Sequence, residues 1–282
     1  MGFPGAVADR AAADYVLVGA PLDVSTTFQP GTRFGPERVR RFARTYDDYD
    51  HRTDLFFSEL GVHDAGDLRA WDDAPDYLDY LTGTLADAVR DDAVPVTLGG
   101  EHTVTAAGVR ATDPDVLVTL DAHLDLREAY DDNPWSHASV CRRALDGDPE
   151  GAALSNADAT ADRLVVLGGR TGSPEEWERA DEPDVTVVPP EDVADWEPAF
   201  AGQDVYLSID IDGADPSVAP GTGTMEPFGL SPREMRDVVR AVAPHAVGCD
   251  AVEVNDRDDG QAAALAGKLV REFVYSHAEP GE

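Results

Sequence analysis

The chain has 282 residues, with 56 Asp or Glu against 22 Lys or Arg, and its formal net charge at pH 7 is −34. So acidic a chain, without a basic patch, excludes nucleic acid and anionic membrane surfaces as expected partners. Hydrophobic residues make up 42%, which is typical of a globular protein, and no apolar run is long enough to cross a bilayer. The first residues lack a signal-peptide pattern, and the two cysteines, Cys141 and Cys249, form no disulfide framework. We therefore expect a cytoplasmic location.

Lysine is almost absent from the chain, since Lys268 is the only one and the other basic residues are arginines. The acidic residues are spread over the whole length, which argues against a disordered acidic tail. Such a chain repels itself at low ionic strength and is stabilised when salt screens its charges. The pattern indicates a protein of a salt-rich cytoplasm, such as that of a halophile, with an ordinary acidic protein as the alternative.

Short β-rich runs alternate with helical patterns along the chain. We expect strands at residues 15–19, 61–63, 94–98, 116–120, 164–167, 185–188, 205–209 and 246–254. We expect helices at residues 36–45, 75–90, 102–111, 138–145, 174–180, 232–243 and 261–277. Pro36, Pro174 and Pro232 occupy first-turn positions, where proline is favoured. This alternation predicts an α/β fold, with a mostly parallel sheet between two layers of helices, in a single domain over residues 1–282.

Polar side chains follow four of the predicted strands at the point where each strand ends. They lie in GGEH at 99–102, DAHLD at 121–125, DID at 210–212 and at Glu253. In open α/β sheets, ligands bind beyond the carboxyl ends of the strands. The sequence therefore predicts a polar site at that edge of the sheet.

The residue types at these strand ends favour metal binding. Asp121, His123 and Asp125 alternate, so in an extended segment all three side chains point to one side. Asp210 and Asp212 repeat that spacing after a buried strand, where carboxylates need a cation or hydrogen-bond donors. Together with His102 they make six ligands, which suit two metal ions with bridging carboxylates, such as Mn²⁺, Zn²⁺ or Fe²⁺. Taken singly, each motif also fits a polar turn or a helix cap.

Taken together, these motifs resemble the signatures of the ureohydrolase family of arginases and agmatinases. The resemblance lies in GGEHT at 99–103, DAHLDLRE at 121–128, SHAS at 136–139, SIDIDGADPSVAPGTGTMEPFGLS at 208–231 and GAPLDVSTTFQPGTRFGPERVR at 19–40. It implies a three-layer α/β/α sandwich around an eight-stranded sheet, assembled as a homotrimer or homohexamer. It also implies two Mn²⁺ ions per chain and the release of urea from a small cationic guanidinium substrate.

The resemblance also implies roles for individual residues. The first ion would be held by His102, Asp121, Asp125 and Asp210, and the second by His123, Asp121, Asp210 and Asp212. Asp125 would also orient the attacking hydroxide, His137 would shuttle a proton to the leaving amine, and Glu253 would hold the guanidinium. The alternatives are a surface position for His137, an ion pair between Glu253 and Arg257, and a metal-binding family member without activity. Ala138, Met225 and Phe228 depart from the family pattern, and the last two change the expected shape of the pocket wall.

The substrate is predicted from the segment that follows the DAHLD motif. Arginases carry an Asn where this chain has Arg127, and they use it to hold the substrate's α-carboxylate. Nearby acids at Glu128, Asp131 and Asp132 are expected to repel a carboxylate and to favour a cationic tail. The sequence therefore predicts agmatine as substrate, cleaved to putrescine and urea. N1-aminopropylagmatine, arginine, formimidoylglutamate and, further off, proclavaminate-type and guanidinobutyrate substrates stay open.

Overall fold

The fold is built on one eight-stranded sheet, in which every pair of neighbouring strands is parallel. The computed structural model describes residues 2–70, 72–149, 154–156, 159–200 and 202–279. Across the sheet the strands are β4 (Val62–Asp67), β1 (Tyr15–Ala20), β5 (Val94–Gly99), β10 (Ala246–Val252), β9 (Val205–Asp210), β6 (Val116–Leu120), β7 (Arg163–Leu167) and β8 (Val185–Val188). The last strand of the sequence therefore lies in the middle of the sheet, between β5 and β9.

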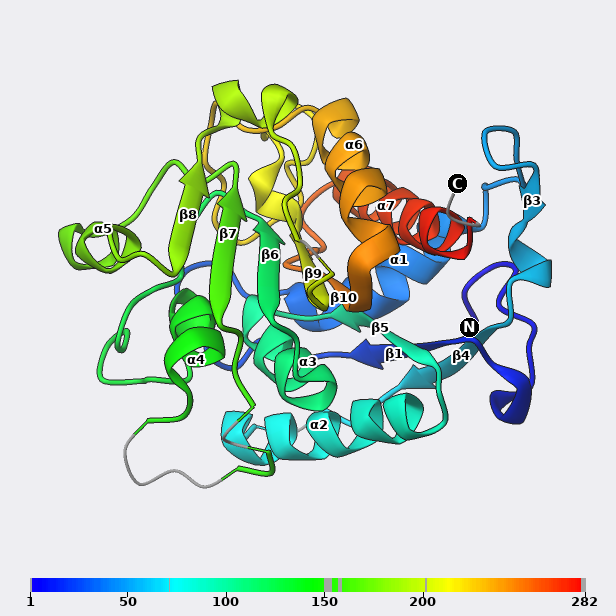
Figure 1. Cartoon of the computed structure of the whole chain (residues 1–282), viewed down its shortest axis with the longest axis horizontal. Coiled ribbons are helices and arrows are strands. Elements are labelled where there is room, and N and C mark those ends of the chain that lie inside the picture. Colours follow the sequence, from blue (N-terminus) through cyan, green and yellow to red (C-terminus); the bar gives the residue numbers. More distant parts are fainter. Residues whose placement is uncertain (1, 71, 150–153, 157–158, 201, 280–282) are drawn as a thin grey trace.

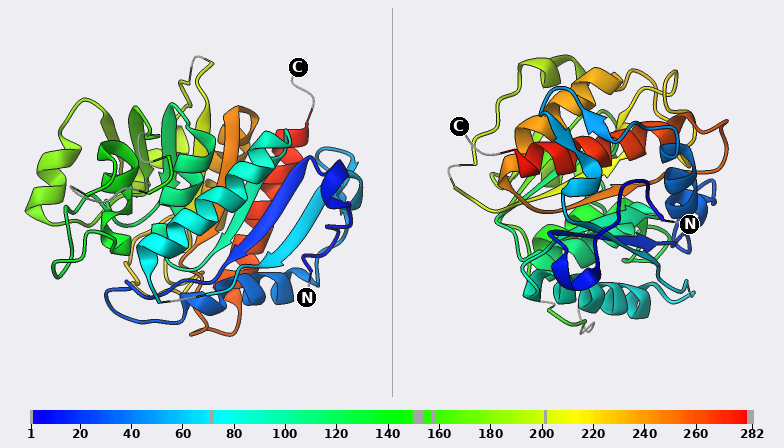
Figure 2. Two further views of the ribbon diagram at one scale, coloured as in Figure 1. Left: turned by 90° about the horizontal axis from the view of Figure 1, so that it is seen from below. Right: turned by 90° about the vertical axis from the view of Figure 1, so that its right-hand side faces the viewer.

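Helices cover both faces of the sheet (Figure 1). They are α1 (Gly35–Ala43), α2 (Ala74–Arg90), α3 (Thr105–Thr112), α4 (Val140–Asp146), α5 (Pro174–Ala180), α6 (Pro232–Val242) and α7 (Gln261–Ala278). One face carries α1, α6 and α7, and the other carries α2, α3 and α4. Figure 2 shows α7 and α2 on opposite sides of the sheet. The three layers are those of the predicted arginase-like sandwich.

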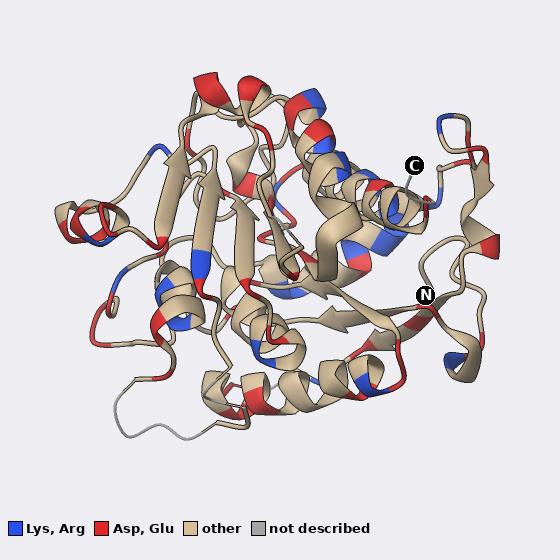
Figure 3. Cartoon of the chain, viewed as in Figure 1, with Lys and Arg blue, Asp and Glu red and all other residues tan. Residues whose placement is uncertain are grey.

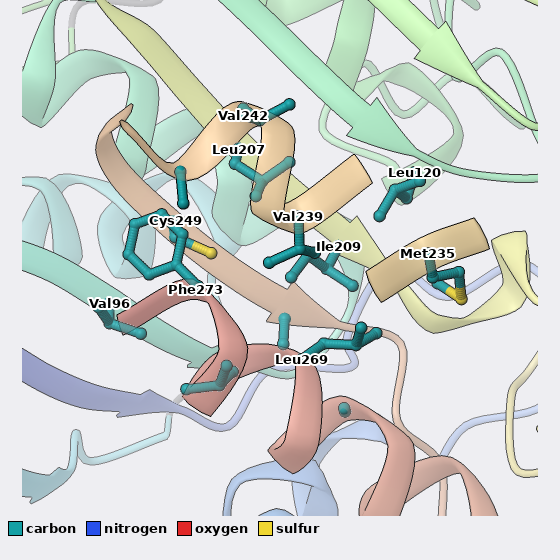
Figure 4. Packing of buried hydrophobic residues seen from close by; sticks show 14 of the residues in the cluster. Val96, Leu120, Leu207, Ile209, Met235, Val239, Val242, Cys249, Leu269 and Phe273 are labelled. Atoms are coloured by element: carbon teal, nitrogen blue, oxygen red, sulfur yellow. The ribbon is translucent and has the colours of Figure 1, made fainter. Parts of the chain in front are cut away.

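Strands β1 and β9 are buried at every position on both faces, which explains why they are nearly continuous apolar runs. Figure 4 shows the core beneath α6 and α7, where Val239 and Phe273 pack over Leu207, Ile209 and Cys249. Two helices of the fold begin with serine caps. Ser173 and Ser231 each accept a hydrogen bond from the glutamate amide three residues on, and that glutamate side chain completes a capping box.

The predicted elements agree with the structure, apart from their ends. The strand predicted at 246–254 stops at Val252, because Glu253 has a left-handed backbone with φ of 59°. The helices predicted to begin at 102 and 138 each start with a 3-10 turn, at His102–Val104 and His137–Ser139. The short hairpin β2 (Tyr49–Asp50) and β3 (Leu55–Phe56) was not predicted, since two-residue strands leave no readable alternation.

Charged positions are distributed over the fold rather than gathered in one region (Figure 3). Red acidic positions occur on the loops and on the helices of both layers, with the arginines scattered among them. Within the described ranges, no helix is both long and apolar enough to cross a membrane.

Candidate metal centre and active site

The predicted polar segments meet at the carboxyl ends of four neighbouring strands. The order β5-β10-β9-β6 brings GGEH, Glu253, DID and DAHLD side by side, although they are far apart in the sequence. The corner after β5 depends on Gly100, because a Cβ there would overlap the backbone of Leu22. This corner carries His102 into the interior, where it is fully buried.

The first group of ligand-type atoms surrounds the Nδ1 atom of His102. That nitrogen lies 2.9 Å from Asp125 Oδ2, 3.2 Å from Asp121 Oδ2 and 3.3 Å from Asp210 Oδ2. The ligand-type atoms of His102, Asp121 and Asp125 all lie within 4.8 Å of one another, close enough to hold one ion. Asp210 therefore borders this group, while its other oxygen accepts a hydrogen bond from the Asp212 amide.

The second group consists of Asp121, His123 and Asp212, whose ligand-type atoms also lie within 4.8 Å of one another. His123 Nδ1 lies 3.1 Å from Asp212 Oδ2 and 3.7 Å from Asp121 Oδ1. Asp121 thus turns one oxygen toward each histidine, as a bridging carboxylate does. Asp212 is held from behind, because Thr224 donates a hydrogen bond to its Oδ2 and Arg170 donates to its backbone carbonyl.

A buried hydrogen-bond chain fixes which nitrogen of His102 carries the proton. Asp250, which is fully buried, accepts hydrogen bonds from Thr105 and from Ser208 Oγ at 2.7 Å. Because Ser208 donates to Asp250, it accepts from His102 Nε2, 3.1 Å away. In the neutral ring, His102 Nδ1 then presents a lone pair to three carboxylates. Four electron-rich atoms pointing at one another call for a cation between them.

The charge balance in the pocket also indicates a site for cations. Among the described residues, none of the four aspartates pairs with Lys or Arg, and Asp121 Oδ2 is buried without a hydrogen-bond partner. Burial and repulsion from neighbouring aspartates raise the pKa of Asp125 and of Asp210. Burial lowers the pKa of His123, but Asp212 and Asp121 outweigh it and raise that pKa. A pocket that draws protons so strongly fits divalent cations bound by carboxylates and imidazoles.

His137 lies beside the aspartates and is nearly buried, at 6% exposure, so the alternative of a surface histidine is wrong. Its Nδ1 lies 2.8 Å from Glu253 Oε1, and its Nε2 contacts Thr27. Burial lowers the pKa of His137, but the Glu253 carboxylate outweighs it and raises the pKa to about 9. Glu253 Oε1 also accepts from the His102 amide, whereas its buried Oε2 has no hydrogen-bond partner among the described residues. The alternative pairing of Glu253 with Arg257 is therefore wrong.

A cavity of about 230 Å³ opens over these groups. Arg127 lines it, held by Glu176 Oε2 at 3.2 Å from its Nε and packed over the Tyr130 ring. The expectation that acids of the following segment lie nearest the substrate is wrong. Glu128 is exposed and pairs with Arg142 and Arg143, while the exposed Asp131 and Asp132 lie outside the cavity lining. Besides the proposed ligand aspartates, the cavity is lined by the acid Glu176, which comes from a distant part of the sequence.

The DAHLD segment converges in a different way from the predicted one. β6 ends at Leu120, and Asp125 has a left-handed backbone with φ of 50°, so the three side chains do not face one side of an extended strand. The turn brings Asp125 back toward His102 instead. Aspartate tolerates this conformation better than most residues, and such backbone strain is common at functional sites.

Several residues of the site were missed by sequence reasoning: Thr27, Ser208, Thr224, Glu176 and Asp250. Thr27, Ser208 and Thr224 lie within the quoted motifs, but serine and threonine carry no distinctive spacing there. Asp250 reads as an acid inside an apolar strand, and a buried carboxylate in that position was a usable signal. The place of Glu176 at the cavity could not be read from the sequence, because its spacing from Ser173 already fits a capping box.

Comparison with known proteins shows which family the chain resembles. An agmatinase of Bacillus cereus is 34% identical over 273 residues, covering 92% of this chain and 90% of that protein. An N(1)-aminopropylagmatine ureohydrolase of Thermococcus kodakarensis is 35% identical over 280 residues, covering 95% and 92%. The crystal structure of the agmatine ureohydrolase of Thermoplasma volcanium matches with a TM-score of 0.87 and 31% identity, over 99% of this chain and 94% of that one. The family model described as "Arginase family" matches residues 13–275. The chain therefore belongs to the arginase family.

Proposed function

We propose that the protein is an agmatinase, a Mn²⁺-dependent ureohydrolase that cleaves agmatine to putrescine and urea. The observation that carries the proposal is the pair of ligand groups joined through Asp121, with His137 and Glu253 beside them. The similarity to agmatinases over nine-tenths of the chain supports the substrate class. One eight-stranded sheet takes strands from residue 15 to residue 252, which supports a single domain over residues 1–282.

The proposed ligands of one ion are His102, Asp121, Asp125 and Asp210. The proposed ligands of the other are His123, Asp121, Asp210 and Asp212. The crowding of carboxylates with two imidazoles favours Mn²⁺ over softer metals. When bound, two such cations supply Lewis acidity that activates water as a nucleophile near neutral pH.

The chain's own residues then bind the substrate and move protons. The unpartnered Oε2 of Glu253 is free to accept a guanidinium N–H in a charge-assisted hydrogen bond. Asp125 lines the cavity as well as the first ligand group, so it can orient the attacking water. His137 lines the same cavity and is the proposed carrier of the proton that the leaving amine needs.

N1-aminopropylagmatine is the second candidate substrate, since a relative named for it matches as well as the agmatinases do. Arg127 at the cavity wall bears on whether the substrate carries a carboxylate, because a free guanidinium there could bind one. Its contact with Glu176 offsets that charge, which favours a substrate without a carboxylate. We expect kcat/KM for agmatine to exceed that for arginine by about 10²-fold.

A substrate panel with added Mn²⁺ tests the proposal. Urea release would be measured for agmatine, N1-aminopropylagmatine, arginine, guanidinobutyrate and formimidoylglutamate at matched salt. Highest kcat/KM for agmatine supports the proposal, and highest kcat/KM for another substrate reassigns it. If the protein binds metal but turns over none of these, the inactive metal-binding alternative takes its place.

A further inference from the structure

Both ring nitrogens of His137 are occupied by partners of opposite character. On one side, Nδ1 lies 2.8 Å from Glu253 Oε1. On the other side, the backbone amide of Thr27 donates to Nε2 at 3.0 Å, and the Thr27 hydroxyl lies 2.9 Å from the same atom. An ionised carboxylate only accepts hydrogen bonds, whereas a backbone N–H only donates.

These partners define the protonation of the ring. We infer that Thr27 is a positioning residue that holds His137 as the neutral tautomer, with its proton on Nδ1 and a lone pair on Nε2. Protonation of Nε2 would turn an N–H toward the Thr27 N–H, at a distance where the two repel. Thr27 thereby opposes the effect of Glu253, which by itself favours the imidazolium. Cations in the two ligand groups would act in the same direction as Thr27.

A second observation shows that Thr27 is held in place rather than resting on His137 by chance. Glu101, fully buried beside His102, accepts hydrogen bonds from the Ser25 amide, the Ser25 hydroxyl and the Thr26 hydroxyl. Ser136, next to His137, donates to the Ser25 carbonyl. The segment 25–27 is therefore anchored both to the corner after β5 and to the histidine's own turn. Glu101 is not a proposed metal ligand, but within the GGEHT motif it serves to anchor the segment 25–27.

The inference deepens the proposed function and rests on it for its chemical meaning. A residue that carries a proton from water to a leaving amine must begin the cycle without that proton. The arrangement that Thr27 holds meets this requirement, because the ring starts neutral, with its lone pair on Nε2 engaged by Thr27. The charged or titratable groups that face the ring are Glu253, Glu101 and Asp125, all of which favour the protonated form. Thr27 is the neighbour that opposes them.

The tautomer can be measured directly on the whole protein. Histidine labelled with ¹⁵N in the ring gives signals from only seven residues, and His137→Asn identifies the signal of His137. Magic-angle-spinning NMR of sedimented protein loaded with diamagnetic Zn²⁺ would be recorded at pH 8. We expect one protonated and one bare ring nitrogen for His137, with the proton on Nδ1. An imidazolium, or a proton on Nε2, would overturn the inference.

Variants of Thr27 provide the second measurement. Thr27→Val removes the hydroxyl but keeps the amide, so kcat should fall by roughly five- to tenfold, the range expected for one neutral hydrogen bond. The same change should raise the pH at which the His137 ring gives up its second proton, while Thr27→Ser restores both properties. Thr45→Val, which removes an exposed hydroxyl far from the site, is the matched control. If the ring signals of His137 are unchanged in Thr27→Val, the Thr27 hydroxyl does not help to hold the tautomer.

The two proposals fail in different ways. If no guanidino compound releases urea but the Nδ1 tautomer is found, the proposed function fails and the assignment of Thr27 stands. If urea is released while His137 carries its proton on Nε2, the function stands and the role of Thr27 is lost.

Discussion

Two regions of this molecule bury carboxylates, and they solve the problem of charge in opposite ways. At the β4 edge of the sheet, Arg40 is 2% exposed and binds Asp64 through Nε at 2.7 Å and Nη2 at 2.8 Å, with Asp67 on its remaining nitrogen. At the centre of the sheet, no described Lys or Arg forms an ion pair with Asp121, Asp125, Asp210 or Asp212, and their basic neighbours are His102 and His123. One region contains its own arginine, and the other has none paired with its carboxylates.

The pKa shifts differ accordingly. Burial raises the pKa of Asp64, but the hydrogen bonds and charge of Arg40 outweigh it and lower that pKa. For Asp210, burial and the neighbouring aspartates act together and raise the pKa well above its ordinary value. Here the buried acids paired with Arg40 serve the fold, whereas the cluster of four aspartates without such a partner marks a site for external cations. That distinction separates functional from structural aspartates in a chain where aspartate is abundant.

The largest expected effect is at the centre. Asp121→Asn, or removal of metal with a chelator, should lower urea release by about 10³-fold or more, because both ligand groups share this carboxylate. Metal analysis of the purified variant should show fewer than two ions per chain. Asp64→Asn is the matched buried control and should keep its metal. Full activity in a preparation with no bound metal would contradict the assignment of the central aspartates as metal ligands.

Removing the internal cation at the β4 edge should affect folding rather than catalysis. Arg40→Met leaves Asp64 buried without its partner and should lower the free energy of unfolding by about 3–5 kcal/mol. Denaturant titration measures the loss. Below its unfolding transition, the variant should still bind metal as the parent does. Weaker metal binding in the folded variant would mean that the two regions are coupled.

A third variant sharpens the comparison by removing a residue that lies beside the ligands without belonging to them. His137→Ala should lower kcat by about 10²-fold while both ions stay bound, because only the proton carrier is lost. His51→Ala, at an exposed histidine, is the control. Near-normal kcat at every pH would exclude His137 from the reaction.

The pH dependence of stability should have opposite signs with and without metal. Asp125, Asp210, His102 and His123 all have raised pKa values, so the folded chelated protein holds more protons than the unfolded chain. Its stability should therefore fall as the pH rises above the ordinary values of 3.8 for Asp and 6.5 for His. Bound metal requires deprotonated ligands, so the loaded protein should gain stability over the same range. Melting curves at matched salt decide the matter, and parallel slopes would contradict it.

The smallest effect expected for any single charge is that of salt on the melting temperature, although it acts on charges over the whole molecule. With a net charge of −34 and one lysine, the surface acids have few partners, so screening should raise the melting temperature from low to molar KCl. Metal loading should be kept constant, so that the change reports on the surface and not on the centre. A flat or falling melting temperature would argue against a halophilic protein.

The alternation of strands and helices was readable because most strands of the large sheet are apolar runs bounded by turn residues. The approach of His102 to Asp121 and Asp125 followed from motifs and from the rule that ligands gather at strand ends. The strand order was not readable, since nothing in residues 246–252 states that they insert between β5 and β9. The same limit explains why Glu176 and Thr27 were missed, and why Glu128 was wrongly placed near the substrate. Loop conformation depends on long-range contacts that local patterns do not encode.

The central position of β10 has a consequence for how the protein is made. Until residues 246–252 are synthesised, β5 and β9 have no common neighbour, and the halves of the metal centre that they carry cannot meet. During translation the amino-terminal strands must therefore wait with an open edge, and folding depends on contacts between distant parts of the chain, which are slow to form. Metal capture is correspondingly expected late, because a chain that stops before Ala246 would contain all six proposed ligands but not the strand that brings them together.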